Sequence, residues 1–195
     1  MFFLGIFSFI LFFFSDLNDV FFRKKTLRFL FPLGALLLAI SVGFQAFSHK
    51  AEASAPVKII FSLLALVFLV LTVYSLFFAI PVDDAYKKPG QKRRVCTAGM
   101  YALCRHPGVL WLSLFFICLS VSTAFPFYSA IVYIVLDILL VIFEDIVVFP
   151  QVLEGYGEYR KRVPFLIPNA RSIACCLGFF YQTKKGIQPG EIKIS

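Results

Sequence analysis

The chain has 195 residues, of which 60% are hydrophobic and 26 are phenylalanine. A soluble domain of this length has no use for so much apolar surface, so the composition excludes a water-soluble globular protein and predicts an all-α, polytopic membrane protein. Charged residues make up only 15% of the chain, yet the net charge is +8. Because the basic residues flank apolar segments and form no separate basic domain, they predict membrane topology and no binding to nucleic acid.

Five apolar runs approach the roughly 20 residues that a membrane-crossing helix needs. They fall at residues 2–15, 29–47, 57–80, 107–124 and 126–148, and the first is the shortest. The first run has no basic region and no small-residue cleavage site, so we expect a membrane helix there and no signal peptide. We expect residues 1–168 to form one transmembrane domain, and residues 169–195 a cytoplasmic tail that is interfacial or flexible, with Gln188–Ser195 as its flexible end.

Basic residues occur in alternate connections between these runs. They are dense in Arg23–Arg28, in Lys87–Arg94 and in the segment after the fifth run, whose first basic residue is Arg160. The second connection carries one Lys and one Glu, and the fourth carries no charge. Since Lys and Arg collect in cytoplasmic loops, this pattern predicts an N-terminus outside the cell and a C-terminus in the cytoplasm.

A first polar cluster lies at the start of the fourth run, in Gly99–Gly108. We expect Pro107 to be the first residue of a helix, where its missing N–H costs nothing, which puts His106 at the N-cap and Arg105 just outside. The free N–H groups and the positive end of the helix dipole then favour an anion beside Arg105. The segment therefore predicts a carboxylate or phosphate site where membrane meets water, with a simple capping role for His106 as the alternative.

A second polar cluster lies at the end of the fifth run. Asp137 and Glu144 are seven residues apart and share a helix face, and a carboxylate inside an apolar run must face a cavity or a partner. Because a short turn joins the last two runs, they are antiparallel neighbours, and the two clusters converge at the cytoplasmic face. The alternative for Glu144 and Asp145 is a pair of solvated helix-end acids, with Arg105 as their partner.

Beyond the fifth run, Pro150 is expected to kink or restart the helix. Residues 151–162 are expected to form an amphipathic segment, with one stripe made by Val152, Tyr156, Tyr159 and Val163. The basic residues Arg160–Arg162 in its last turn suit the helix dipole and anionic headgroups. Taken alone, the two tyrosines also fit a role as interfacial anchors.

Together the two clusters resemble the isoprenylcysteine carboxyl methyltransferase family, in the broad sense that includes bacterial phospholipid and small-thiol methyltransferases. The resemblance covers residues 92–168. The family pattern G-x-Y-x-x-x-R-H-P is matched by Gly99, Tyr101, Arg105, His106 and Pro107. The later elements E-E-x-x-L, Y-x-x-Y and V-P-R-x-I-P are matched by Glu144, Asp145, Val148, Tyr156, Tyr159, Val163, Pro164, Ile167 and Pro168.

The resemblance implies a methyltransferase that takes S-adenosylmethionine from the cytosol and an apolar or lipidic acceptor from the bilayer. It places the cofactor between residues 99–112 and 137–168, against Tyr101, Arg105, His106, Pro107, Glu144, Tyr156 and Tyr159. It gives catalytic roles to Arg105, Glu144 and Asp145 and implies no metal. Phe165 replaces the Arg that holds the substrate carboxylate in prenylcysteine methyltransferases, so Arg160 or Arg162 would have to take that role.

Two other functions fit the same residues. A membrane reductase that uses NADPH could place the cofactor phosphates at the anion site, because sterol and steroid reductases of related architecture carry an R-H-P-like element. A lipid-binding or scaffolding protein that lost the substrate Arg is the non-catalytic alternative. The acceptor (carboxylate, thiol or amine) and the oligomeric state stay open at this point.

Overall fold

The computed structural model describes residues 1–48, 53–79 and 93–184. The expected basic residues Lys87, Lys88 and Lys92 and the expected flexible end Gln188–Ser195 lie outside the described residues. Three helical segments in the described part are long and apolar enough to cross a membrane: Phe2–Phe22, Lys25–Phe47 and Ala55–Phe78. The protein is therefore an all-α membrane protein, as its composition predicts.

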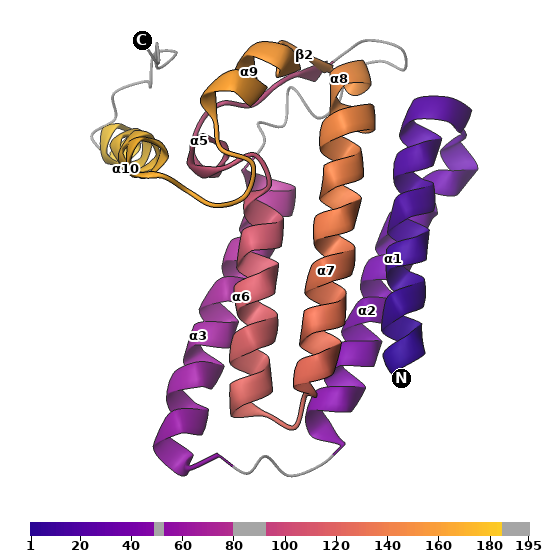
Figure 1. The fold of residues 1–195 in the computed structure, drawn as a ribbon, viewed down its shortest axis with the longest axis vertical. Helices are drawn as coiled ribbons and strands as arrows, with labels where there is room; N and C mark the ends of the chain where they lie inside the picture. The colour runs from indigo at the N-terminus through magenta and orange to yellow at the C-terminus, as the bar shows by residue number, and fades with distance from the viewer. Residues whose placement is uncertain (49–52, 80–92, 185–195) are drawn as a thin grey trace.

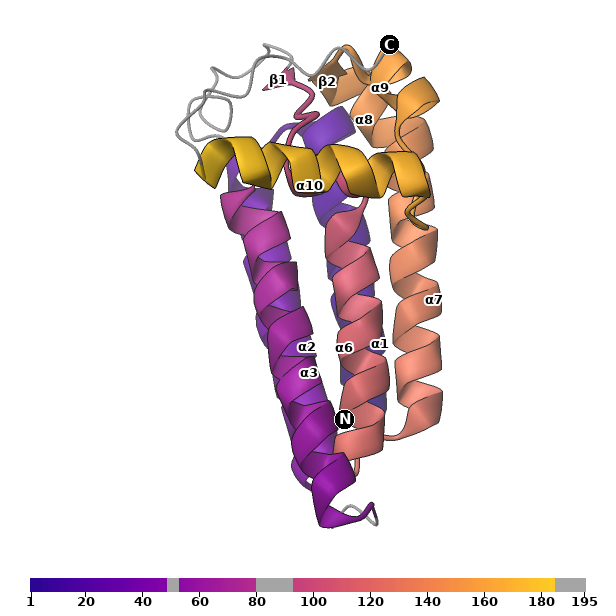
Figure 2. The same ribbon diagram turned by 90° about the vertical axis from the view of Figure 1, so that its left-hand side faces the viewer.

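The long helices run side by side as a bundle (Figures 1 and 2). They are α1 (Phe2–Leu17), α2 (Leu30–Phe47), α3 (Ala55–Val73), α6 (Pro107–Ser122) and α7 (Phe127–Phe143). The helix α1 packs against α2, α3 packs against α6, and α7 lies between α6 and α1. At 16 residues, α6 is shorter than the three segments above, but it lies within the same layer.

Short turns of π-helix or 3-10 helix lie at the same end of the bundle, after α1, α3 and α7 and before α2. These are η1 (Asn18–Phe22), η2 (Lys25–Phe29), η3 (Tyr74–Phe78) and η4 (Glu144–Val148). The first helical segment thus extends to Phe22, well past the apolar run that we expected to end at residue 15. The polar Asn18 does not end the helix, because its amide is buried and bonds both the N–H and the C=O of Lys24, at 2.9 and 3.1 Å.

A buried polar network fixes the opposite end of the bundle. The hydroxyl of Tyr133 donates to the Phe2 carbonyl at 3.0 Å and accepts from the Gln45 amide at 3.1 Å. Ser129 donates to the same Gln45 side chain at 2.7 Å, so the network joins α1, α2 and α7. In an apolar environment each such group needs a partner, and the network therefore sets how these helices sit against one another.

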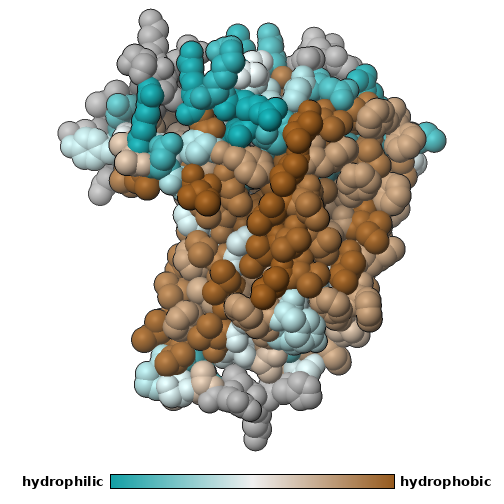
Figure 3. Space-filling view, in the orientation of Figure 1, coloured by the Kyte–Doolittle hydropathy of each residue, from teal (hydrophilic) through white to brown (hydrophobic). Residues whose placement is uncertain are grey.

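The remaining elements gather at the end of the bundle that carries η1 and η4 (Figure 1). They are β1 (Arg93–Arg94), α5 (Met100–Leu103), α8 (Phe149–Val152), β2 (Leu153–Glu154), α9 (Tyr156–Arg162) and α10 (Ala170–Lys184). The two short strands pair in parallel, with Arg93 opposite Leu153. Figure 3 shows that this end is hydrophilic and that the flank of the bundle below it is hydrophobic.

The expected amphipathic segment over residues 151–162 is not one helix. It divides into α8, β2 and α9, because Leu153–Glu154 is extended and Gly155 adopts a left-handed conformation with φ +80°. Only glycine takes this conformation without steric cost, so Gly155 ends one element and opens the next. Pro150 lies in the first turn of α8, which begins directly after η4, so a new helix starts at this proline as expected.

Candidate functional site

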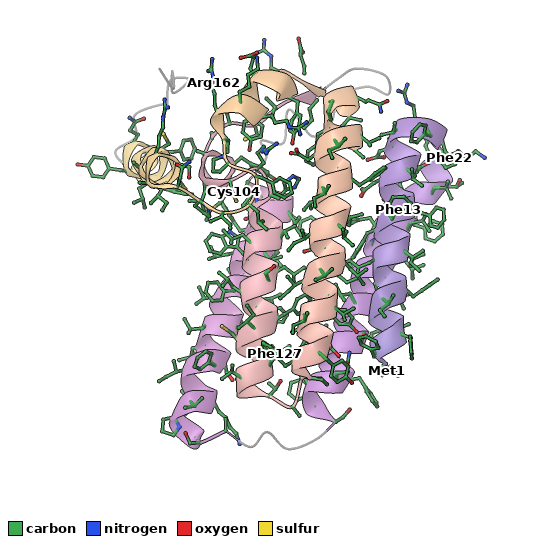
Figure 4. All side chains as sticks on the ribbon, viewed as in Figure 1. Met1, Phe13, Phe22, Cys104, Phe127 and Arg162 are labelled. Atoms are coloured by element: carbon green, nitrogen blue, oxygen red, sulfur yellow. The ribbon has the colours of Figure 1, made fainter. Side chains whose placement is uncertain are left out.

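The segment between α5 and α6 has the local structure that its sequence predicts. His106 is the N-cap of α6 and Pro107 its first residue. The backbone N–H of Arg105 donates to the carbonyl of Pro164 at 2.9 Å, which ties this segment to the chain that follows α9. Figure 4 shows Cys104, the neighbour of Arg105, at the same end of the bundle as Arg162, and Met1 and Phe127 at the other end.

Asp145 is the centre of the site. Nη1 of Arg105 lies 2.6 and 2.7 Å from its two carboxylate oxygens, and the hydroxyl of Tyr156 donates to one of them. Nε of Arg160 lies 3.3 Å from the other oxygen. Asp145 is only 3% exposed, so it is no solvated helix-end acid. A buried carboxylate requires such compensation, and here its partners come from the α5–α6 connection and from α9.

His106 connects both acids of η4. Its Nδ1 lies 3.6 Å from Glu144 Oε2 and its Nε2 lies 3.5 Å from Asp145 Oδ1. The ring stacks on Phe149, with centroids 5.5 Å apart, and meets the edge of Phe165 at 5.1 Å. Burial lowers the pKa of His106 to about 4, although Asp145 opposes the shift. His106 is therefore neutral at pH 7 and adds no positive charge to the expected anion site.

Two buried nitrogens at the site form no hydrogen bond within the described part of the chain: Nε of Arg105, and Nε2 of His106, which lies 3.5 Å from Asp145 Oδ1. Buried nitrogens of this kind are uncommon in folded proteins, and a bound polar group is one way to satisfy them. The Glu144 side chain stays 20% exposed, so its carboxylate is also within reach of a ligand.

The hydroxyl groups of Tyr101 and Tyr159 link the elements that carry the site. The Tyr159 hydroxyl donates to the Tyr101 carbonyl at 2.8 Å, and the Tyr101 hydroxyl donates to the Ser75 carbonyl at 3.0 Å. Burial raises the pKa of both phenols, which keeps them as donors. The structure thus brings Arg105, His106, Glu144, Asp145 and Tyr156 together, and it uses Tyr101 and Tyr159 to join α5, α9 and η3.

Asp16 and Phe149 are site residues that the sequence analysis did not find. The carboxyl groups of Asp16, in α1, and Glu144 interact. No spacing relates these two residues, and only the packing of α1 beside η4 brings them together. An acid at the end of an apolar run was the available clue for Asp16. Asp137 lies inside such a run and is buried, with one oxygen unpartnered among the described residues.

Fold and site together define a helical membrane protein with a buried, charge-paired centre at one end of its bundle. The family model described as "Protein of unknown function (DUF1295)" matches residues 14–163. The chain belongs to this family, and the matched part contains both polar clusters. Comparison with curated proteins and with solved structures gave no match.

Proposed function

We propose that this protein is an integral-membrane methyltransferase that uses S-adenosylmethionine, similar to the isoprenylcysteine carboxyl methyltransferase family. The observation that carries the proposal is the meeting of the two sequence segments on which that resemblance depends. Arg105 and Asp145 lie 40 residues apart in the chain and form one buried ion pair at the end of an apolar bundle. The site is thus next to both an aqueous end and a lipid-facing flank, as a lipid-modifying enzyme needs.

The topology that we propose has five membrane spans, with α6 and α7 as the fourth and fifth. The lateral packing of α6 on α3 and of α7 beside α1 supports it, since these helices share one layer. The basic turn Arg23–Lys25 and the basic end of α9 lie at the same end as the site. By the positive-inside rule this end is cytoplasmic, with the N-terminus outside and the C-terminus in the cytoplasm.

The residues present suit the proposed cofactor. The unpartnered Nε of Arg105 is a donor for the carboxylate of its amino-acid end, and Glu144 suits its amine or ribose hydroxyls. When bound, S-adenosylmethionine supplies an electrophilic methyl group on a sulfonium. Asp145 would hold the Arg105 guanidinium in place, and Tyr156 would hold Asp145.

The side chains at the site favour this cofactor over NADPH. Within the described residues, the carboxyl groups of Asp16, Glu144 and Asp145 lie near the side chains of Arg105 and the half-exposed Arg160. Carboxyl groups can accept hydrogen bonds from the ammonium group and the ribose hydroxyls of S-adenosylmethionine, whereas the phosphates of NADPH require donors or cations in their place. The reductase is therefore the second candidate, supported by the unpartnered Arg105 nitrogen alone.

The proposed acceptor side of the site is apolar, because Phe165 stands where the isoprenylcysteine carboxyl methyltransferase family has an Arg. The ring of Phe165 lies 5.3 Å from the Arg105 guanidinium carbon and contacts His106. We infer an acceptor that is small or lipidic and reaches the site from the bilayer. A carboxylate or thiolate acceptor needs no strong base. For an amine acceptor, Glu144 would take the released proton, because Asp145 is already engaged by Arg105 and Tyr156.

Binding of methyl-labelled S-adenosylmethionine to the protein in lipid nanodiscs tests the proposal. The parent should bind, and Glu144→Gln should weaken binding about tenfold or more, because a hydrogen bond to a charged group contributes on the order of 1.5–3 kcal/mol. Glu158→Gln is the matched control, since Glu158 is an exposed acid of α9 that pairs with Lys161. Transfer of the label is then followed into lipid, into a small thiol and into a prenylcysteine analogue.

Three results contradict the proposal. If the unmutated protein binds NADPH in isothermal titration and does not bind S-adenosylmethionine, it is a reductase. If the unmutated protein binds neither cofactor, the result supports the lipid-binding alternative. If Glu144→Gln and Glu158→Gln bind the labelled cofactor equally, the assignment of Glu144 is wrong.

A further inference from the structure

The 15-residue helix α10 lies crosswise over the ends of the bundle helices (Figure 2). One side of it is fixed to the protein. Cys176 is buried in a cluster with Ala102 and Leu103 of α5, and the ring of Phe179 is the closest side chain to Gly99. The helix therefore packs on the short segment that leads to Arg105 and His106.

A second side of α10 is apolar and exposed. Ile173, Leu177 and Tyr181 are four residues apart, so they form one row along the helix. Their exposed fractions are 43%, 64% and 61%. Ile167, in the connection before α10, is 81% exposed. Such a contiguous apolar row marks an interaction surface, since isolated exposed apolar residues are common but aligned ones are not.

The position of α10 in the molecule indicates what covers the apolar row. Helical spacing places Gly178 about 100° and Gln182 about 140° around the helix axis from Leu177. The helix lies at the level where the hydrophilic end of the molecule meets its hydrophobic flank (Figure 3). The exposed basic residues Lys161 and Arg162 of α9 belong to the same end.

We propose that α10 docks on the surface of the surrounding bilayer, with Ile173, Leu177 and Tyr181 at the boundary between headgroups and acyl chains. An amphipathic helix parallel to a membrane buries its apolar face to that depth, and basic residues nearby attract anionic headgroups. Because Cys176 packs on α5, the bilayer then also supports the segment from Gly99 to His106. This inference is independent of the methyltransferase proposal.

Fluorescence quenching by brominated lipids tests the docking. The chain has a single Trp, Trp111, so Leu177→Trp and Gly178→Trp are made in a Trp111→Phe background. A Cβ at Gly178 meets nothing within 4 Å, which makes Gly178 a matched control one residue further along the helix. In nanodiscs of phosphatidylcholine brominated near the headgroup end of its acyl chains, Trp at position 177 should be quenched several-fold more than Trp at position 178.

Equal quenching at the two positions overturns the proposal, and so does the absence of quenching at position 177. If the Trp111→Phe background fails to fold, Trp111 is retained and its own quenching, measured in the parent, is subtracted. A second measurement tests the support of α5: Leu177→Glu should speed amide hydrogen exchange in Met100–Leu103 in nanodiscs, and Gln182→Glu should not. Unchanged exchange in Leu177→Glu would show that α5 does not depend on the bilayer.

Discussion

Replacing Asp145 by Asn removes the charge that holds the two polar clusters together. The change leaves the Arg105 guanidinium, whose side chain is 10% exposed, without its carboxylate, and it weakens the bond from Tyr156. Loss of one partner from a buried ion pair costs about 3–5 kcal/mol. Arg160 adds little to this figure because its side chain is 47% exposed and its charge stays solvated. We therefore expect a loss in that range.

Unfolding of the protein in mixed micelles of increasing SDS content, followed by circular dichroism, measures this loss. Glu158→Gln removes an acid from an ion pair at the surface and should leave the unfolding free energy unchanged. The double variant Arg105→Met, Asp145→Leu removes both charges and should recover much of the stability, since the uncompensated guanidinium is then absent. A loss in Asp145→Asn no larger than in Glu158→Gln would refute the reasoning, and so would a double variant that loses the sum of the single losses.

Three further predictions concern single positions. Because burial lowers the pKa of His106 to about 4, the unfolded chain binds its proton first as pH falls through 6.5; the unfolding free energy should drop by on the order of 2 kcal/mol from pH 7 to pH 5, and less in His106→Gln. Gly5→Ala should lower the thermal unfolding midpoint, because its Cβ would lie 2.0 Å from the Tyr133 hydroxyl, whereas Gly43→Ala, with nothing within 4 Å, should not. Tyr159→Phe should cost about 1 kcal/mol in SDS unfolding, since its buried hydroxyl donates to a backbone carbonyl.

The local structure at the start of α6 could be predicted from residue types alone. Pro107 begins α6 and His106 caps it because proline fits the first turn of a helix, and this preference acts over neighbouring residues only. The same kind of local argument failed for residues 151–162, where the extended pair Leu153–Glu154 and the left-handed Gly155 break the expected stripe. The pairing of β2 with β1, which is distant in the chain, competes there with helical periodicity.

The sequence alone predicts a helical membrane protein. Its apolar runs are long enough to cross a bilayer, and in lipid a helix is one of the few structures that satisfies all backbone hydrogen bonds. The partners of each polar side chain could not be predicted from the sequence, because they depend on how helices that are distant in the chain pack together. The contact between Asp16 and Glu144 needs α1 beside η4. The engagement of Arg105 by Asp145, and the neutral state of His106, need burial that composition cannot report. The exposed apolar row of α10 likewise emerges only after Cys176 has fixed the other side of that helix against α5.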